Sequence, residues 1–106
     1  MVELVWTDTA AKWLQEIYEY NAQDSAIKAR QVVQGIYARA QVLIEYPGIG
    51  YLYRHEPDGD VKVLLYGHYR ITYMQRTEHQ IDILGVFHGA LPLERYIKKH
   101  ADQLES

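Results

Sequence analysis

The chain has 106 residues, enough for one compact domain, and 48% of them are hydrophobic, which excludes an intrinsically disordered protein. Cysteine is absent, so disulfides, thiolate nucleophiles and zinc–thiolate sites are excluded too. The formal net charge of −3 at pH 7 disfavours a general nucleic-acid binder, since such proteins neutralise phosphates with Lys and Arg. No apolar run approaches the roughly 20 residues that span a bilayer, and the first residues lack a signal-peptide pattern. We therefore expect a cytoplasmic protein that does not enter a membrane.

The first half of the chain predicts a strand followed by two helices. Residues 2–6 form a short apolar run typical of a strand, and residues 7–9 supply three candidate N-caps. Apolar side chains then recur at helical spacing over residues 10–18 and again over residues 26–44, before Pro47-Gly48 ends the second helix. Because the link between them is short, we expect the two helices to lie antiparallel as a hairpin.

The second half changes to a period of two. Residues 48–59 are interrupted by glycine and proline, but the Tyr51-Leu52-Tyr53 segment within them is too apolar for a free loop, so we expect it to pack on the domain. Strands are predicted at residues 61–66 and 69–74, with Gly67-His68 as a tight hairpin turn. Residues 80–88 are apolar at nearly every position, which is typical of a central strand covered on both faces.

An apolar stripe over residues 93–104, with Pro92 near its first turn, predicts a C-terminal helix. The whole chain, residues 1–106, is expected to be one domain of the α+β class. In this prediction an antiparallel helical hairpin packs on one face of a three-stranded meander, the N-terminal strand brings the sheet to about four strands, and a C-terminal helix follows.

Three segments resemble those of one family. They read VWTDTAAKWLQEI near the start, VLLYGHYRITY in the hairpin and DILGVFHGA at the last strand. Their order and spacing are similar to those of the ParE/RelE superfamily, the toxins of type II toxin–antitoxin systems. The resemblance implies a growth-inhibiting protein that a co-expressed small antitoxin of the ParD or RelB kind silences by binding, in a toxin–antitoxin hetero-oligomer.

The resemblance also implies one of two targets. ParE-like members act on DNA gyrase, and RelE-like members cut messenger RNA on the ribosome. In the second branch, basic residues on the sheet and near the last helix steady the phosphate, and a tyrosine lies near the end. Aligned with this sequence, the two basic positions fall on Leu65 and Ala90, which are apolar, while the tyrosine matches Tyr96. This favours the gyrase-binding branch.

Histidine can replace a missing base. Four histidines lie between residue 55 and the end of the last strand: His55, His68, His79 and His88. His88 ends the central strand, so it is either a catalytic base or a residue that hydrogen-bonds the turn into the last helix. We expect His68 and His79 to be solvated surface residues. If the chain is an endoribonuclease, its candidate catalytic residues are His88, Tyr96 and Arg70.

Seven residues are candidates for binding the target or the antitoxin: Arg54, Lys62, Arg70, Tyr73, His88, Arg95 and Tyr96. Arg54 and Lys62 are expected to form a working cationic face, because nothing in the pattern requires them structurally. Arg70 and Tyr73 belong to the hairpin signature, and Arg70 is expected to pair with an acidic residue across the sheet, Asp82 being the candidate.

No metal or other cofactor is expected, because no histidine pair has ligand spacing and Gly48-x-Gly50 opens no helix. The sequence therefore predicts a ParE-like toxin that inhibits DNA gyrase by binding, not as an enzyme. Two alternatives stay open. The first is a RelE-like ribosome-dependent mRNA endoribonuclease, and the second is a non-toxic binding module that stabilises a plasmid or chromosome.

Overall fold

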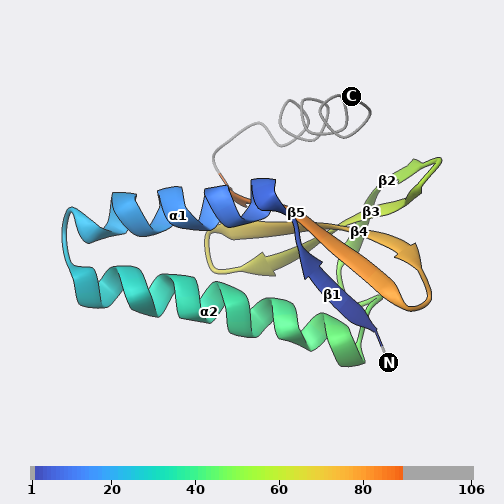
Figure 1. Cartoon of the computed structure of the whole chain (residues 1–106), viewed down its shortest axis with the longest axis horizontal. Coiled ribbons are helices and arrows are strands. Elements are labelled where there is room, and N and C mark those ends of the chain that lie inside the picture. Colours follow the sequence, from blue (N-terminus) through green and yellow to red (C-terminus); the bar gives the residue numbers. More distant parts are fainter. Residues whose placement is uncertain (1, 90–106) are drawn as a thin grey trace.

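The computed structural model describes residues 2–89 and has two helices and a five-stranded mixed sheet. The C-terminal helix predicted over residues 93–104 lies outside the described residues. In chain order the elements are β1 (Glu3–Trp6), α1 (Asp8–Ala22), α2 (Ala26–Glu45), β2 (Tyr51–Glu56), β3 (Gly59–Tyr66), β4 (Tyr69–Thr77) and β5 (Gln80–His88). The strands lie in the order β1-β5-β4-β3-β2, with β1 parallel to β5 and every other pair antiparallel (Figure 1).

The helical hairpin forms as predicted, with α1 and α2 side by side and antiparallel (Figure 1). Each helix begins at a side chain that accepts a hydrogen bond from a free amide of the first turn. The Thr7 hydroxyl accepts from the amide of Ala10 at 3.1 Å, and the Ser25 hydroxyl accepts from the amide of Lys28 at 3.2 Å. The second helix ends at Glu45, ahead of Pro47.

The sheet has five strands where about four were predicted, because residues 51–56 form the edge strand β2. Tyr51 pairs with Val63 and Glu56 with Gly59 of β3, and the register shifts between Leu52 and Arg54. The segment packs on the domain as expected, but it is a strand because it pairs with β3. The bulge at residue 53 breaks the alternation that would have indicated a strand in the sequence.

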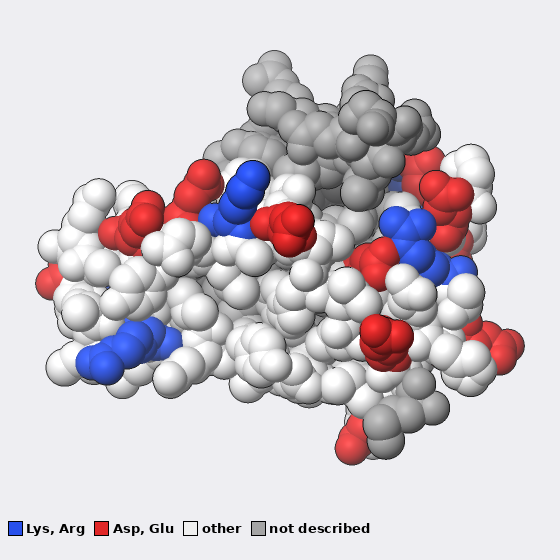
Figure 2. All heavy atoms as spheres, viewed as in Figure 1, with Lys and Arg blue, Asp and Glu red and all other residues white. Residues whose placement is uncertain are grey.

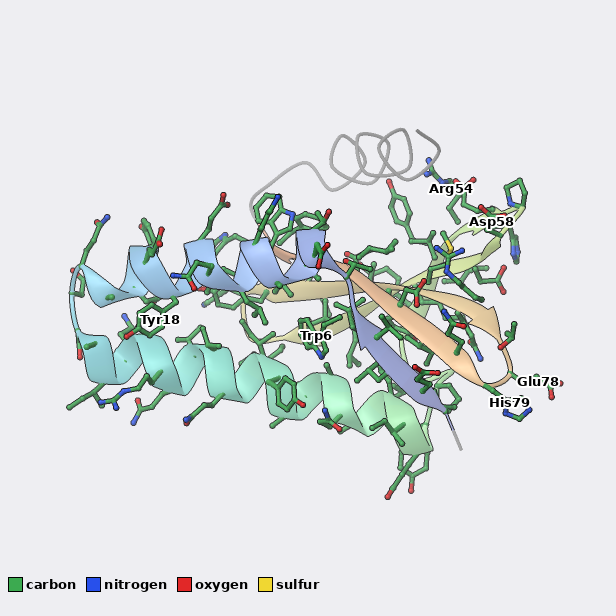
Figure 3. The ribbon with its side chains drawn as sticks, viewed as in Figure 1. Trp6, Tyr18, Arg54, Asp58, Glu78 and His79 are labelled. Carbon is green, nitrogen blue, oxygen red and sulfur yellow. The ribbon has the colours of Figure 1, made fainter. Side chains whose placement is uncertain are left out.

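One face of the sheet packs against the helical hairpin. Side chains from both helices and three strands form one buried cluster: Ala10, Ile36, Ala40, Leu43, Leu64, Ile71, Tyr73, Ile81, Ile83 and Val86. Trp6 lies between β1 and α2 and stacks on Tyr37 at a centroid distance of 5.8 Å (Figure 3). This helix face holds most of the large, fully buried side chains of the described residues.

The opposite face of the sheet carries a second, smaller cluster of Val61, Val63, Met74, Leu84 and Phe87. Trp13, on the first helix, reaches this second face and packs edge-on against Phe87, with ring centroids 4.9 Å apart. Tyr53 packs against the same cluster from β2. No helix among the described residues is long and apolar enough to cross a membrane.

Candidate functional site

A tight turn and a strand end bring two histidines together at one corner of the sheet. Gly67 takes a positive φ of 56°, which an L side chain rarely adopts, and so closes the turn between β3 and β4. Tyr69 then pairs with His88, the last residue of β5, and the amide of Gly89 donates to the carbonyl of His68 at 2.6 Å. The rings of His68 and His88 lie nearly parallel, with their centroids 6.1 Å apart.

Two hollows meet at this corner. A depression of about 360 Å³ lies over the turn and is lined by Leu65, Gly67, His68, Tyr69, Arg70, His88 and Gly89. A more apolar groove of about 460 Å³ runs between α1 and the strand ends and is lined by Trp13, Glu16, Ile17, Tyr20, Tyr69, Val86 and His88. His88 and Tyr69 line both hollows, and the two rings meet edge-on at 5.7 Å. The amide of Asn21 donates to the Tyr69 hydroxyl at 3.3 Å, which ties the corner to α1.

Arg70 points into the depression, and the expected pairing with Asp82 is wrong. The register places Arg70 opposite Phe87 and Leu65, whereas Asp82 lies opposite Met74. The Asp82 carboxylate instead contacts the guanidinium of Arg76 and accepts from the Gln80 amide at 3.1 Å. Within residues 2–89 Arg70 forms no ion pair. Arg70 is therefore the arginine that the described residues place at the depression.

Arg54 and Lys62 do not form one cationic face as expected. Arg54 pairs with Val61, which belongs to the second face, while Lys62 alternates with Val61 and Val63 and so lies on the helix face. Both charged groups also have a partner within the protein. The Arg54 guanidinium forms an ion pair with Glu56, and the Lys62 ammonium donates to the Gln75 side chain at 2.9 Å. Figure 3 shows Arg54 at the far end of the β2–β3 hairpin.

Tyr73 is fully buried and serves the structure from inside. Its hydroxyl donates to the carbonyl of Pro47 at 3.0 Å and accepts from the amide of Gly50 at 3.1 Å. A Cβ at Gly50 would lie 2.5 Å from this hydroxyl, so only glycine allows the approach. Burial raises the pKa of the Tyr73 hydroxyl above its ordinary value of 10.0, and the hydrogen bond from Gly50 opposes part of this rise. A surface contact through Tyr73 has no support in this arrangement.

The remaining candidates lie elsewhere. His79 is exposed in the β4–β5 turn, and His55 is exposed and lies 2.6 Å from the Asp60 carboxylate. His68 is exposed as expected, but its place beside His88 was missed. Two signals in the sequence could have indicated the pair: the tight turn at Gly67-His68 and the strand that ends at His88. Arg95, Tyr96 and Ala90 lie outside the described residues.

The charges of the site favour an anion. Among residues 2–89, Arg70 and two histidines line the depression, and no carboxylate does. Elsewhere on the face shown in Figure 2, acidic and basic side chains alternate in small groups and form no broad basic patch. Between residues 2 and 89 no group of three or more His, Cys, Asp or Glu could hold a metal ion. The described lining of the corner therefore suits a phosphate or a carboxylate of a partner.

The family comparison covers most of this structure. The model described as "ParE toxin of type II toxin-antitoxin system, parDE" matches residues 4–91. The chain therefore belongs to the ParE toxin family. A chain of the solved structure "Chromosomal ParDE TA system from P. aeruginosa" is 25% identical to this ParE-family chain, with a TM-score of 0.68. The match covers 83% of this chain and 96% of that one. No curated protein matches significantly.

The corner lies within the region that matches the ParE toxin model. All seven residues that line the depression fall inside the region matched by the ParE toxin model, as do both helices. Residues 92–106 follow the matched region. The corner at Arg70 and His88 thus belongs to the ParE-type domain itself.

Proposed function

We propose that this ParE-family toxin acts in the cytoplasm, where it inhibits growth by binding DNA gyrase, and that a small ParD-like antitoxin neutralises it in a hetero-oligomeric complex. The observation that carries the proposal is the match of the ParE toxin model over residues 4–91. The ParE branch is the one that the superfamily resemblance associates with gyrase. In this proposal the chain blocks its target by occupying a surface, and no bond of the target is broken by the toxin.

The chemistry of the corner supports binding over cleavage. Cleavage of RNA needs several cations around the scissile phosphate to stabilise the charge of the transition state. Among residues 2–89, the depression is lined by one arginine, Arg70, and the position aligned with the basic residue of the sheet is Leu65, which is 52% exposed. One arginine beside an exposed apolar side chain suits a protein contact, in which apolar area and a single ion pair act together.

A supercoiling assay with purified gyrase tests the proposal. The natural chain is expected to inhibit supercoiling, and Arg70→Ala and His88→Ala are each expected to raise the concentration needed by roughly tenfold or more, which corresponds to about 1.4 kcal/mol. Arg30→Ala is the matched control, because Arg30 is exposed on α2 and lines neither hollow. A natural chain that leaves supercoiling unchanged at micromolar concentration contradicts the proposal.

A second candidate is ribosome-dependent cleavage of mRNA. It is favoured by one observation, which is that Arg70, His68 and His88 line one depression together. An arginine can hold the phosphate while a histidine moves a proton. Induction of the chain in bacteria, with pulse labelling over the first minutes, separates the candidates. Arrest of DNA synthesis first supports gyrase, arrest of protein synthesis first supports cleavage, and no arrest supports a non-toxic module.

The antitoxin surface is proposed to include the free edge of β2. Tyr51 and Leu52 are each 47% exposed on this strand, and Tyr46 and Ile49, just before it, are 61% and 47% exposed. An edge strand also offers unpaired amide and carbonyl groups to an added strand. Hydrogen exchange with and without the antitoxin tests this, and the expected result is slower exchange over residues 49–56. Protection confined to the helical hairpin would place the antitoxin there instead.

A further inference from the structure

Two tyrosines flank the tight turn of the corner and reach different helices. Tyr66 is the last residue of β3, Tyr69 is the first residue of β4, and the register pairs them across the hairpin. Both side chains are partly buried and pack against the cluster on the helix face. Tyr69 contacts α1 and Tyr66 contacts α2, so the hairpin that carries the depression is attached to both helices.

The contact with α1 is made by Asn21. This residue lies in the last turn of α1 and is 8% exposed. Its side-chain amide donates to the Ile17 carbonyl at 2.8 Å and to the Tyr69 hydroxyl at 3.3 Å, as a buried polar group requires. The Tyr69 ring in turn meets the His88 ring edge-on, with their centroids 5.7 Å apart. A polar side chain of the helix therefore holds an aromatic ring that lies directly beside His88.

The contact with α2 depends on a glycine in the middle of that helix. A Cβ at Gly35 would lie 1.9 Å from the Tyr66 hydroxyl oxygen and 2.6 Å from the ring carbon that bears it, so the tyrosine occupies the space of a side chain. Glycine weakens a helix interior, and here its missing side chain allows the close approach. One helical turn later, the Arg39 guanidinium donates to the Leu65 carbonyl at 3.3 Å. Two consecutive residues of β3 are thus held by α2 just before the turn.

We propose that Asn21, Gly35 and Arg39 are positioning residues, through which the helical hairpin fixes the shape of the corner. Among the described residues these three line neither hollow, so each acts through the strand residue that it holds. A partner binds a fixed site more tightly than a loose one, because ordering a loose site on binding costs conformational entropy. The effect of the three residues on gyrase affinity rests on the proposed function, whereas their effect on the shape of the corner does not.

The ring signals of the histidines in an NMR spectrum of the full chain test the shape of the corner without a partner. The signal of a ring proton depends on where neighbouring aromatic rings lie, and the His88 ring lies next to those of His68 and Tyr69. Asn21→Ala releases the Tyr69 hydroxyl and is expected to shift the His88 signal. The signal of His55, which is exposed on β2, is expected to stay in place.

Two further variants show whether the hydrogen bond carries the effect. Tyr69→Phe removes the same bond from its other side, so the shifts of the His88 signal in the two single variants should not add in the double variant. Gln15→Ala is the matched control on the same helix, because it removes a side-chain amide that bonds Glu19 on the exposed surface, and it should leave the His88 signal unchanged. An unshifted His88 signal in Asn21→Ala, or additive shifts in the double variant, overturns the proposal for α1.

The contact with α2 is tested in the supercoiling assay. Arg39→Ala is expected to raise the concentration that halves supercoiling by about two- to tenfold, the effect of one lost hydrogen bond. Gly35→Ala displaces Tyr66 and is expected to raise it at least as much. Arg30→Ala, exposed on the same helix, is the control and should leave inhibition unchanged. Urea unfolding of each variant separates a loss of affinity from a loss of folded protein.

The two tests also separate this proposal from the proposed function. If the natural chain does not inhibit gyrase, the proposed function fails, and the His68 signal of Arg39→Ala then decides whether α2 positions the turn. A shift of that signal supports positioning by α2, and an unshifted signal overturns it. If the natural chain inhibits gyrase and both α2 variants inhibit it equally well, the proposal for α2 is wrong and the proposed function stands.

Discussion

The two faces of the sheet differ in how they are covered. The helix face is closed by two capped helices joined by a short link, and its centre is fixed by Tyr73, whose hydroxyl holds the turn from Pro47 to Gly50. The second face has a smaller cluster, and at its open end lie the depression and Arg70. The difference indicates that the helix face holds most of the buried core of the described residues, whereas the second face leaves Leu65 and Arg70 at one end beside the depression.

The largest expected effect on stability comes from Ile83 and Leu84, two consecutive residues whose side chains point to opposite faces of the sheet. Ile83 is 0% exposed on the helix face, and Leu84, the next residue, is 6% exposed on the second face. We expect Ile83→Ala to lower the free energy of unfolding by about 2–5 kcal/mol. Leu84→Ala should cost less, because Leu84 belongs to the smaller cluster and is slightly exposed. Urea unfolding measures both, and equal costs would show that the two faces are equally rigid.

The next effect comes from the ion pair between Asp82 and Arg76. The side chains are 9% and 29% exposed, so Asp82→Ala leaves a largely buried guanidinium without its carboxylate. We expect a loss of about 1–3 kcal/mol in the free energy of unfolding. Glu56→Ala, which breaks the more exposed ion pair between Arg54 and Glu56, is the comparison and should cost under about 1 kcal/mol. Thermal unfolding of both variants decides, and the reverse ranking would contradict the burial argument.

A smaller effect is expected for Tyr73→Phe, which removes the two hydrogen bonds of the hydroxyl and should cost about 1–2 kcal/mol. The buried Tyr73 hydroxyl also makes the free energy of unfolding depend on pH. Since burial raises the pKa of Tyr73 above 10.0, the folded state holds this proton more tightly than the unfolded state does. Its contribution is therefore complete below pH 10 and is lost as the pH rises above that value. Unfolding at pH 9 and pH 11 should show a steeper loss for the natural chain than for the variant.

The smallest expected effect is that of Leu65→Arg. Leu65 is 52% exposed at the open end of the second face, so the free energy of unfolding should change by no more than about 0.5 kcal/mol. Val63→Arg is the contrast, two residues away on the same strand and face but 0% exposed, and it should prevent stable folding. Circular dichroism on both variants shows whether burial separates the two positions. A folded Val63→Arg protein would contradict the burial of Val63.

Local signals in the sequence predicted the helical hairpin, the tight turn at Gly67-His68 and the last strand over residues 80–88, because each depends on caps, periodicity or turn residues close in sequence. The edge strand β2 was missed because it depends on pairing with β3, and its bulge hides the alternation. The parallel pairing of β1 with β5 likewise joins residues more than 70 positions apart, for which the sequence carries no local mark.

The candidate site was predicted less well, because it depends on register. Arg70 and His88 were candidates from the start, and the structure places both at one depression. The pairing of Arg70 with Asp82 was wrong because the register puts Arg76 nearer to that carboxylate. Arg54 and Lys62 were expected on one face, and the pleat sends them to opposite faces. Strand alternation is visible in the sequence, but the bulge between Leu52 and Arg54 is not. The bulge puts Arg54 opposite Val61 of β3, and so on the second face.

The parallel pairing of β1 with β5 also determines when the sheet can be completed during synthesis of the chain. β1 is complete at residue 6, and the strand that pairs with it begins at Gln80. At roughly 5–20 residues per second, a translating ribosome takes about 4–15 s to make the residues between them. Throughout that interval the sheet lacks its second strand, and the corner at His88 has not been made. The nascent chain therefore lacks both the complete sheet and the corner at His88 until the last strand has been translated.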